Sequence, residues 1–229
     1  MNKFFMQLLR KPAALCWTRW ALASAAMVFA PVWAGGMQSL ELFLKNTQSG
    51  RADFVQVVTS PAKEGQTARV KTSSGNFAFA RPGRFKFEYL KPFAQTMVAD
   101  GQTLWMYDVD LNQVTARQQA QVLGATPAAL IASAPNLKAL QAEFSLADAP
   151  ARSGLEWVQA SPRAKDGQLQ WVRVGLRSGT KGMELAVLEM LDSFGQTSVL
   201  TFSPMELNPA LPASTFEFKP PKGADVIRQ

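Results

Sequence analysis

The chain has 229 residues, of which 24 are basic and 17 acidic, and it contains no histidine and one cysteine, Cys16. This composition excludes Ser-His-Asp triads, Cys-His pairs and zinc sites built on histidine and cysteine. The formal net charge of +7 is not gathered into a basic patch, so we expect no nucleic acid partner.

Residues 1–34 have the features of a cleaved secretory signal peptide. They include four basic residues and no acidic one, an apolar run from Trp20 to Val32, and the sequence Val32-Trp33-Ala34, which suits a signal peptidase. The apolar run is shorter than the roughly 20 residues of a membrane span. The alternative is a retained N-terminal anchor.

Removal of residues 1–34 would leave one domain, 35–229, with a net charge of +3. Cys16 would leave with the signal, and it precedes the apolar run, so it is badly placed for lipid attachment. We therefore expect a mature protein without disulfide or thiol chemistry. The expected location is the periplasm.

The first predicted element of this domain is a short amphipathic helix within 37–47. Leu40, Phe43 and Leu44 follow the i, i+3, i+4 spacing of one helical face. We expect this face to lie against an apolar surface.

A hairpin with one strongly aromatic face is predicted over 75–89. Phe77 and Phe79 alternate with small or polar residues in its first strand, and the second strand continues the alternation with three further aromatic residues, Phe85, Phe87 and Tyr89. If the first strand keeps its pleat to its end, Arg81 points to the aromatic side.

Short strands dominate the rest of the chain. Their predicted ranges are 95–99, 103–107, 113–116, 155–160, 168–176, 183–191, 197–202 and 215–218. Turn residues separate them, which is typical of an antiparallel sheet that curls into a barrel or sandwich.

Two further short helices are predicted between these strands. Thr126 and Pro127 suit the start of one that stops before Pro135, and Asn136 suits the cap of the next, which carries Leu137 and Leu140. The first is too small and apolar to stand alone, so it must lie on an apolar surface.

The remaining polar patterns predict no catalytic or metal centre. In a strand, Glu184 and Glu189 point to opposite faces, so we interpret them as surface charges. Asp108 and Asp110 have the spacing of a calcium loop, but the glycine and glutamate that this loop needs are absent. We expect no metal, no cofactor and no enzymatic activity.

Large apolar side chains are frequent on the predicted sheet. Residues 104–107 are apolar on both faces, with Leu104 and Met106 on one and Trp105 and Tyr107 on the other. Aromatic and methionine side chains fit irregular apolar ligands. The alternative is that they only fill a core.

Several stretches together resemble the periplasmic lipoprotein-carrier family, LolA. They are, in chain order, "GRADFVQ", "FARPGRFKF", "DGQTLWMYD", "TPAALIA" and "STFEFKPPKGADV". The resemblance implies a mainly β (α+β) fold, an incomplete antiparallel β-barrel curled around an apolar cavity and covered by short helices. It also implies a monomeric carrier that takes lipoproteins from an inner-membrane ABC-type export complex to an outer-membrane receptor.

The resemblance implies a particular role for Arg81, which precedes proline as the functional arginine of the family does. There it bonds backbone carbonyls of the covering helices and holds the empty cavity closed. A guanidinium that faces apolar surface needs acceptors, and its five donors suit the free carbonyls at helix ends. The alternative is a strand-end arginine whose charged head reaches water.

The acyl chains of the cargo are expected to meet one set of apolar side chains. These are Leu44, Phe54, Phe77, Phe79, Phe85, Phe87, Tyr89, Met97, Trp105, Leu130 and Ile131. The chain departs from the family pattern at Phe87, where tryptophan is frequent. It also departs at 128–131, which begins with smaller side chains than in other family members. Two other proteins of similar fold remain as alternatives, an outer-membrane lipoprotein receptor and a periplasmic lipoprotein-sensing regulatory domain.

Overall fold

The computed structural model describes residues 35–62, 65, 67–122, 134–164 and 167–229. The chain separates into two units, Met1–Trp33 and Ala34–Gln229, and all the described residues belong to the second. The predicted signal peptide, 1–34, lies outside them, as does the predicted helix that starts at Thr126, except for its last residue.

Helices are few and short. Their bounds are α1 Gly36–Asn46, α2 Gln119–Val122, α4 Leu137–Glu143 and the 3₁₀ helix η2 Ala213–Phe216. The predicted cap of α4 is confirmed, because the side chain of Asn136 accepts a hydrogen bond from Ala139 N at 2.9 Å. Within the described ranges, no helix has the length and apolar character needed to cross a membrane.

In the part of the chain that the structure describes, thirteen strands accompany these helices. The first seven are β1 Ser49–Ser60, β2 Arg69–Ala80, β3 Arg84–Lys91, β4 Gln95–Asp100, β5 Thr103–Asp108, β6 Gln113–Gln118 and β7 Phe144–Arg152. The others are β8 Leu155–Pro162, β9 Leu169–Gly179, β10 Gly182–Asp192, β11 Thr197–Phe202, β12 Glu206–Leu207 and β13 Asp225–Arg228.

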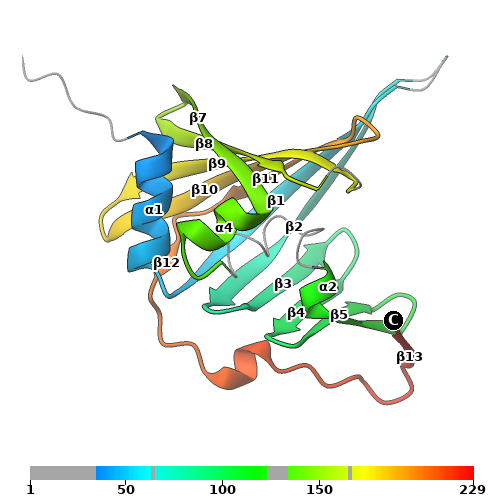
Figure 1. The fold of residues 1–229 in the computed structure, drawn as a ribbon. Coiled ribbons are helices and arrows are strands. Elements are labelled where there is room, and N and C mark those ends of the chain that lie inside the picture. Colours follow the sequence, from blue (N-terminus) through cyan, green and yellow to red (C-terminus); the bar gives the residue numbers. More distant parts are fainter. Residues whose placement is uncertain (1–34, 63–64, 66, 123–133, 165–166) are drawn as a thin grey trace, which may run out of the picture. The chain divides into compact units, whose positions relative to one another are not determined.

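All the strands belong to one sheet, which curls without closing (Figure 1). Its order is β13-β6-β5-β4-β3-β2-β1-β11-β10-β9-β8-β7, with β12 paired to β1. Every pairing is antiparallel except that of β13 with β6. The predicted mainly-β fold is thus confirmed as an incomplete barrel, and β13 and β7 form its two edges.

The inner face of the sheet is the one that carries Phe77 and Leu188, and it holds the main hydrophobic core. The β-hairpin register places Phe77 opposite Phe87 and Phe79 opposite Phe85, so the aromatic side chains of β2 and β3 share this face. Helix α1 covers the inner face along β7 to β10. As predicted, Leu40, Phe43 and Leu44 are the buried face of α1.

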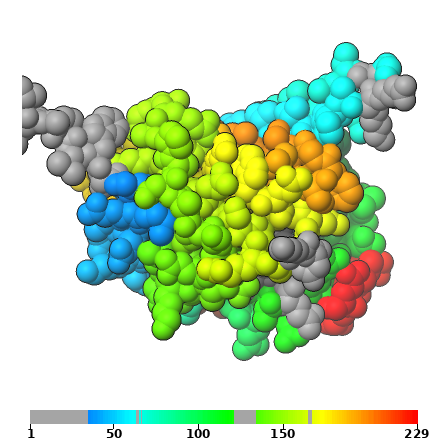
Figure 2. All heavy atoms as spheres, turned by 45° about the horizontal axis from the view of Figure 1, so that its top comes forward, coloured from blue at the N-terminus to red at the C-terminus, as the bar shows by residue number. Residues whose placement is uncertain are grey.

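The outer face of the sheet is partly covered by the chain after β11. This segment runs from β12 through η2 to β13 beside the β3–β6 strands (Figure 1). Figure 2 turns the molecule to show strands β7 to β10, with the β1/β2 hairpin projecting at one side.

Two predictions made from the sequence are wrong, one in the chain after β11 and one in β10. Residues 215–218 do not form a strand, because η2 occupies Ala213–Phe216 and Phe216 is buried there. Glu184 is not a surface charge: it is 7% exposed, accepts a hydrogen bond from Arg177 at 3.0 Å, and also accepts one from Met205 N at 3.3 Å. A partner across the hairpin therefore stabilises a carboxylate that the alternation alone assigned to solvent.

Candidate functional site: an aromatic inner face closed by an arginine

The centre of the candidate site is a group of stacked and edge-on aromatic rings on the inner face. The ring centroid of Phe77 lies 4.4 Å from that of Phe87 and 5.8 Å from that of Phe79. Phe54 meets Phe87 and Tyr89 edge-on at 5.5 and 5.0 Å. Such geometries add about 0.5–1.5 kcal/mol per pair beyond burial.

The structure brings most of the predicted acyl-chain residues together. Six of them are buried in one cluster: Leu44, Phe54, Phe77, Phe79, Phe85 and Phe87. Tyr89 and Met97 are half-buried against the same cluster. Leu130 and Ile131 lie outside the described residues.

Trp105 is not part of this cluster. Its indole lies 5.6 Å from the ring of Phe218 and donates to Asp100 Oδ2 at 3.1 Å. Leu104 faces the inner core, and the next residue of a strand faces the other way. The prediction that Trp105 lines the acyl-chain site therefore conflicts with its place on the outer face.

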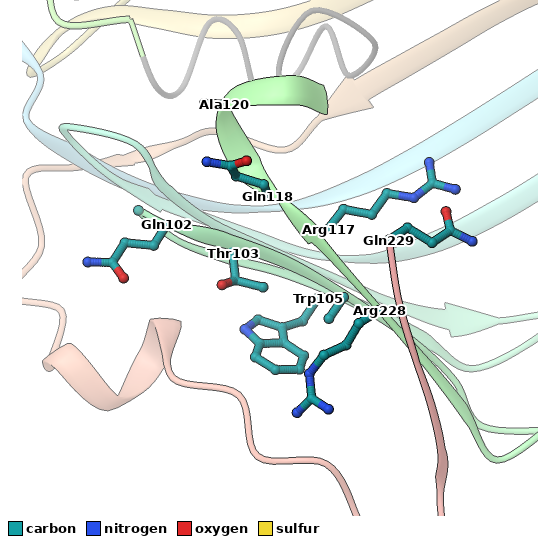
Figure 3. A pocket seen from close by; sticks show the side chains of 10 residues that line it. Gln102, Thr103, Trp105, Arg117, Gln118, Ala120, Arg228 and Gln229 are labelled. Carbon is teal, nitrogen blue, oxygen red and sulfur yellow. The ribbon is translucent and has the colours of Figure 1, made fainter.

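Trp105 instead lines a surface pocket of about 670 Å³ (Figure 3). Polar side chains line the pocket as well, and those of Thr103 and Arg228 lie beside the indole. This mixed polar and apolar lining differs from the wholly apolar ring cluster of the inner face, to which we assign the acyl chains.

Arg81 lies where the aromatic hairpin meets α1. Its side chain is 8% exposed, its Nε donates to Thr47 O at 2.8 Å, and its Nη1 donates to Ala134 O. The guanidinium also stands 5.3 Å from the ring centroids of both Phe43 and Phe79. The predicted inward orientation is confirmed, and the alternative of a solvated strand end is wrong.

The two carbonyls that receive Arg81 belong to segments far apart in the sequence. Thr47 is the C-cap of α1, so its carbonyl has no partner within the helix. Ala134 comes shortly before α4. One cationic side chain therefore joins α1, the strand β2 and the chain that leads into α4.

Burial lowers the pKa of Arg81 from its ordinary 12.5 to about 10. The guanidinium is still charged at neutral pH. The change means that the closed arrangement disfavours the charge by about 3 kcal/mol relative to water. Its hydrogen bonds to Thr47 O and Ala134 O oppose that cost, so the net stabilisation is small and Arg81 is a contact that can be released.

The burial of Tyr89 against the ring cluster can be tested through the pH dependence of stability. Burial raises the pKa of Tyr89 to about 12 from 10.0. The hydroxyl is neutral in both states below pH 10, and its contribution to stability is lost as the pH rises from 10 to 12. At pH 11 the wild type should therefore lose about 1 kcal/mol of unfolding free energy that Tyr89→Phe, which has no hydroxyl to ionise, does not lose.

The measurement is denaturant unfolding of wild type and variant at pH 8 and pH 11. Tyr107→Phe is the matched control, because Tyr107 is the other tyrosine of the chain and lies on the outer face against Phe218. The burial of Tyr89 is refuted if its variant loses as much stability at pH 11 as wild type does.

Several residues of the site were not singled out from the sequence. Thr47 and Ala134 act through backbone carbonyls, which carry no sequence signal. Phe43 was predicted to be on the buried face of α1 but was not assigned to the site. Phe202 stacks near Phe77, with ring centroids 5.4 Å apart, and alternation along its strand could have placed it there.

The described residues contain no group of three metal-ligating side chains. The chemistry available at the site is therefore apolar contact on the inner face together with hydrogen bonding by one buried guanidinium. This combination suits reversible binding of an apolar ligand.

Comparison with known proteins gives one consistent family. The family model "Outer membrane lipoprotein carrier protein LolA" matches residues 45–219. An outer-membrane lipoprotein carrier protein of Albidiferax ferrireducens is 70% identical over 86% of this chain and 92% of its own length. A protein of the same description from Leptothrix cholodnii is 49% identical over 86% of this chain and 87% of its own length. Another, from Methylibium petroleiphilum, is 47% identical over 91% of this chain and 97% of its own length. The chain belongs to the LolA family of outer membrane lipoprotein carrier proteins.

Proposed function

We propose that this protein carries lipoproteins through the periplasm by covering their acyl chains with the inner face of its sheet. The observation that carries the proposal is the cluster of phenylalanine rings on the inner face, which meets α1 at Phe43 and is closed by a buried arginine. Burial of a dozen methylenes is worth about 10 kcal/mol. An apolar face of this kind therefore binds acyl chains strongly without any catalytic group.

The closed arrangement also explains how release can occur. In this structure the rings contact one another and α1, so acyl chains enter only when α1 and the chain at Ala134 move away from the sheet. Opening breaks the bonds of Arg81, and closing restores them. Arg81 thus offsets part of the free energy of lipid binding, and cargo is not held too tightly to be delivered.

We also propose the two ends of the route. The cargo comes from an inner-membrane ABC-type export complex and passes to an outer-membrane lipoprotein receptor. Family membership supports both steps.

Residues 1–34 are proposed to be a signal peptide removed on export, so that the mature chain starts at about Gly35 and works as a monomer in the periplasm. N-terminal sequencing of protein from the periplasmic fraction should read from about Gly35. An intact N-terminus retained in the membrane fraction would contradict the proposal.

Site-specific photocrosslinking tests the proposed acyl-chain face. We expect a photoreactive phenylalanine at Phe87 to capture lipoprotein, because this side chain is 3% exposed in the ring cluster. Lys86 is the matched control, since it is the preceding residue of β3 and faces the outer pocket beside Glu88. Equal capture at 86 and 87, or capture at 86 alone, would contradict binding on the inner face.

A further inference from the structure

The turn that carries Arg81 is a meeting point of buried polar side chains. Among the residues that the structure describes, five polar or charged side chains are buried, and three of them, Thr47, Arg81 and Gln119, gather around this turn. Arg81 and Thr47 belong to the closing contact described above. Gln119 has no part in that contact, and it is only 3% exposed.

Gln119 joins two turns of the sheet through one side chain. It directly follows β6 and begins α2. Its Nε2 donates to Gly83 O at 2.6 Å, and its Oε1 accepts from Gly101 N at 3.0 Å. Its backbone N donates to Gln102 O at 2.8 Å, so the residue itself is fixed to the second turn.

This position requires both a donor and an acceptor. Gly83 has a φ of +73°, and a Cβ there would lie 3.4 Å from Gln119 Nε2, so amide and turn are in close contact. A glutamate would keep the bond from Gly101 N but would place an acceptor against the carbonyl of Gly83. A methionine would keep the shape and lose both bonds, leaving the carbonyl of Gly83 and the N–H of Gly101 without this side-chain partner.

The same turn is held on its other side by Arg81. Arg81 N donates to Gln48 O at 2.8 Å, and its side chain reaches Thr47 O. The turn 81–83 thus has α1 on one side and Gln119 on the other. If Gly83 shifts, the backbone of Arg81 in the same turn shifts with it. The hydrogen bonds of the guanidinium would then weaken, because hydrogen bonds depend steeply on alignment.

We propose that Gln119 is a positioning residue for the Arg81 contact: it fixes the turn 81–83 so that the guanidinium reaches Thr47 O and Ala134 O. Gln119 lies outside the aromatic cluster to which the acyl chains are assigned. The inference rests on the proposed carrier function, in which that contact opposes acyl-chain binding. Gln119 therefore affects delivery through Arg81 and leaves uptake intact.

The test combines a two-step transfer assay with a probe of Arg81 itself. We expect Gln119→Met and Gln119→Glu to take up lipoprotein normally and to deliver it up to about tenfold more slowly, the weight of one hydrogen bond. Nitrogen-15 NMR should show faster hydrogen exchange at Arg81 Nε–H in both variants. Gln170→Met, the same change at an exposed residue of β9, should match wild type in every measurement.

A double variant separates positioning from general destabilisation. With Arg81→Leu already present, Gln119→Met should slow delivery no further, whereas its loss of unfolding free energy should still add to that of Arg81→Leu. The inference is overturned if the delivery defects multiply, or if Arg81 Nε–H exchange is unchanged in Gln119→Met. A failure of wild type to bind lipoprotein would instead overturn the carrier function, and the exchange measurement would still decide the link from Gln119 to Arg81.

Discussion

Replacement of Arg81 by leucine is expected to leave uptake of lipoprotein intact and to slow its delivery by up to about a hundredfold. Charge-assisted hydrogen bonds are worth about 1.5–3 kcal/mol each, and burial of the guanidinium takes back about 3 kcal/mol. The two bonds to Thr47 O and Ala134 O together give about 3–6 kcal/mol, so the net bias toward the closed form is up to about 3 kcal/mol, which corresponds to a rate factor of up to about a hundred. Leucine removes the bonds to Thr47 O and Ala134 O and adds apolar surface, so both changes favour the lipid-bound form.

The experiment scores uptake from the inner membrane and delivery to the receptor separately. Arg84→Leu is the matched control, because Arg84 lies in the same hairpin but stands over Phe216 on the outer face, 5.5 Å from its ring centroid. Arg81→Lys should fall between wild type and leucine, since it keeps the charge without the planar fork. Delivery by Arg81→Leu at the wild-type rate would refute the closing role.

The second large effect is expected at Gly36, where α1 rests on the sheet backbone to backbone. A Cβ at Gly36 would lie 2.1 Å from the carbonyl oxygen of Trp157, a backbone atom that cannot rotate away. We expect Gly36→Ala to reduce the free energy of unfolding by about 3 kcal/mol, the upper end of the usual range for overpacking, because the backbone atom it meets cannot move aside. Helix α1 should also separate from β8, which withdraws Thr47 from Arg81.

Chemical denaturation measures the loss, and limited proteolysis reports the release of α1. Gly167→Ala is the control, because a Cβ there meets only Leu169 N at 4.0 Å and Gly167 has no positive φ. If Gly36→Ala and Gly167→Ala unfold at the same denaturant concentration, the close docking of α1 is wrong.

The periodicity of apolar residues in the sequence correctly predicted the aromatic hairpin and helix α1. The aromatic hairpin and the stripe of α1 were found because one face of each is buried, and a buried face repeats at the period of its element. Strand β7 was missed because its sequence, FSLADAPAR, has little alternation and lies at an edge, where one side meets solvent.

The candidate site was predicted less completely than the fold. Arg81 could be placed by the pleat of its strand, but its acceptors Thr47 and Ala134 come together only through the tertiary structure. Trp105 was assigned to the site because of its size, although the alternation with Leu104 placed it on the other face. Glu184 was assigned to the surface because the sequence does not show its ion pair with Arg177.

The acyl chains of lipoproteins are expected to lie on the inner face of this sheet. Native mass spectrometry of the protein isolated from the periplasm tests this binding without any label. We expect a complex of one protein with one lipoprotein that still carries its acyl chains. This complex should be lost when Phe77, at the centre of the ring cluster, is replaced by glutamate in a variant that remains folded. Protein that carries no lipoprotein, or a complex that persists unchanged in Phe77→Glu, would contradict it.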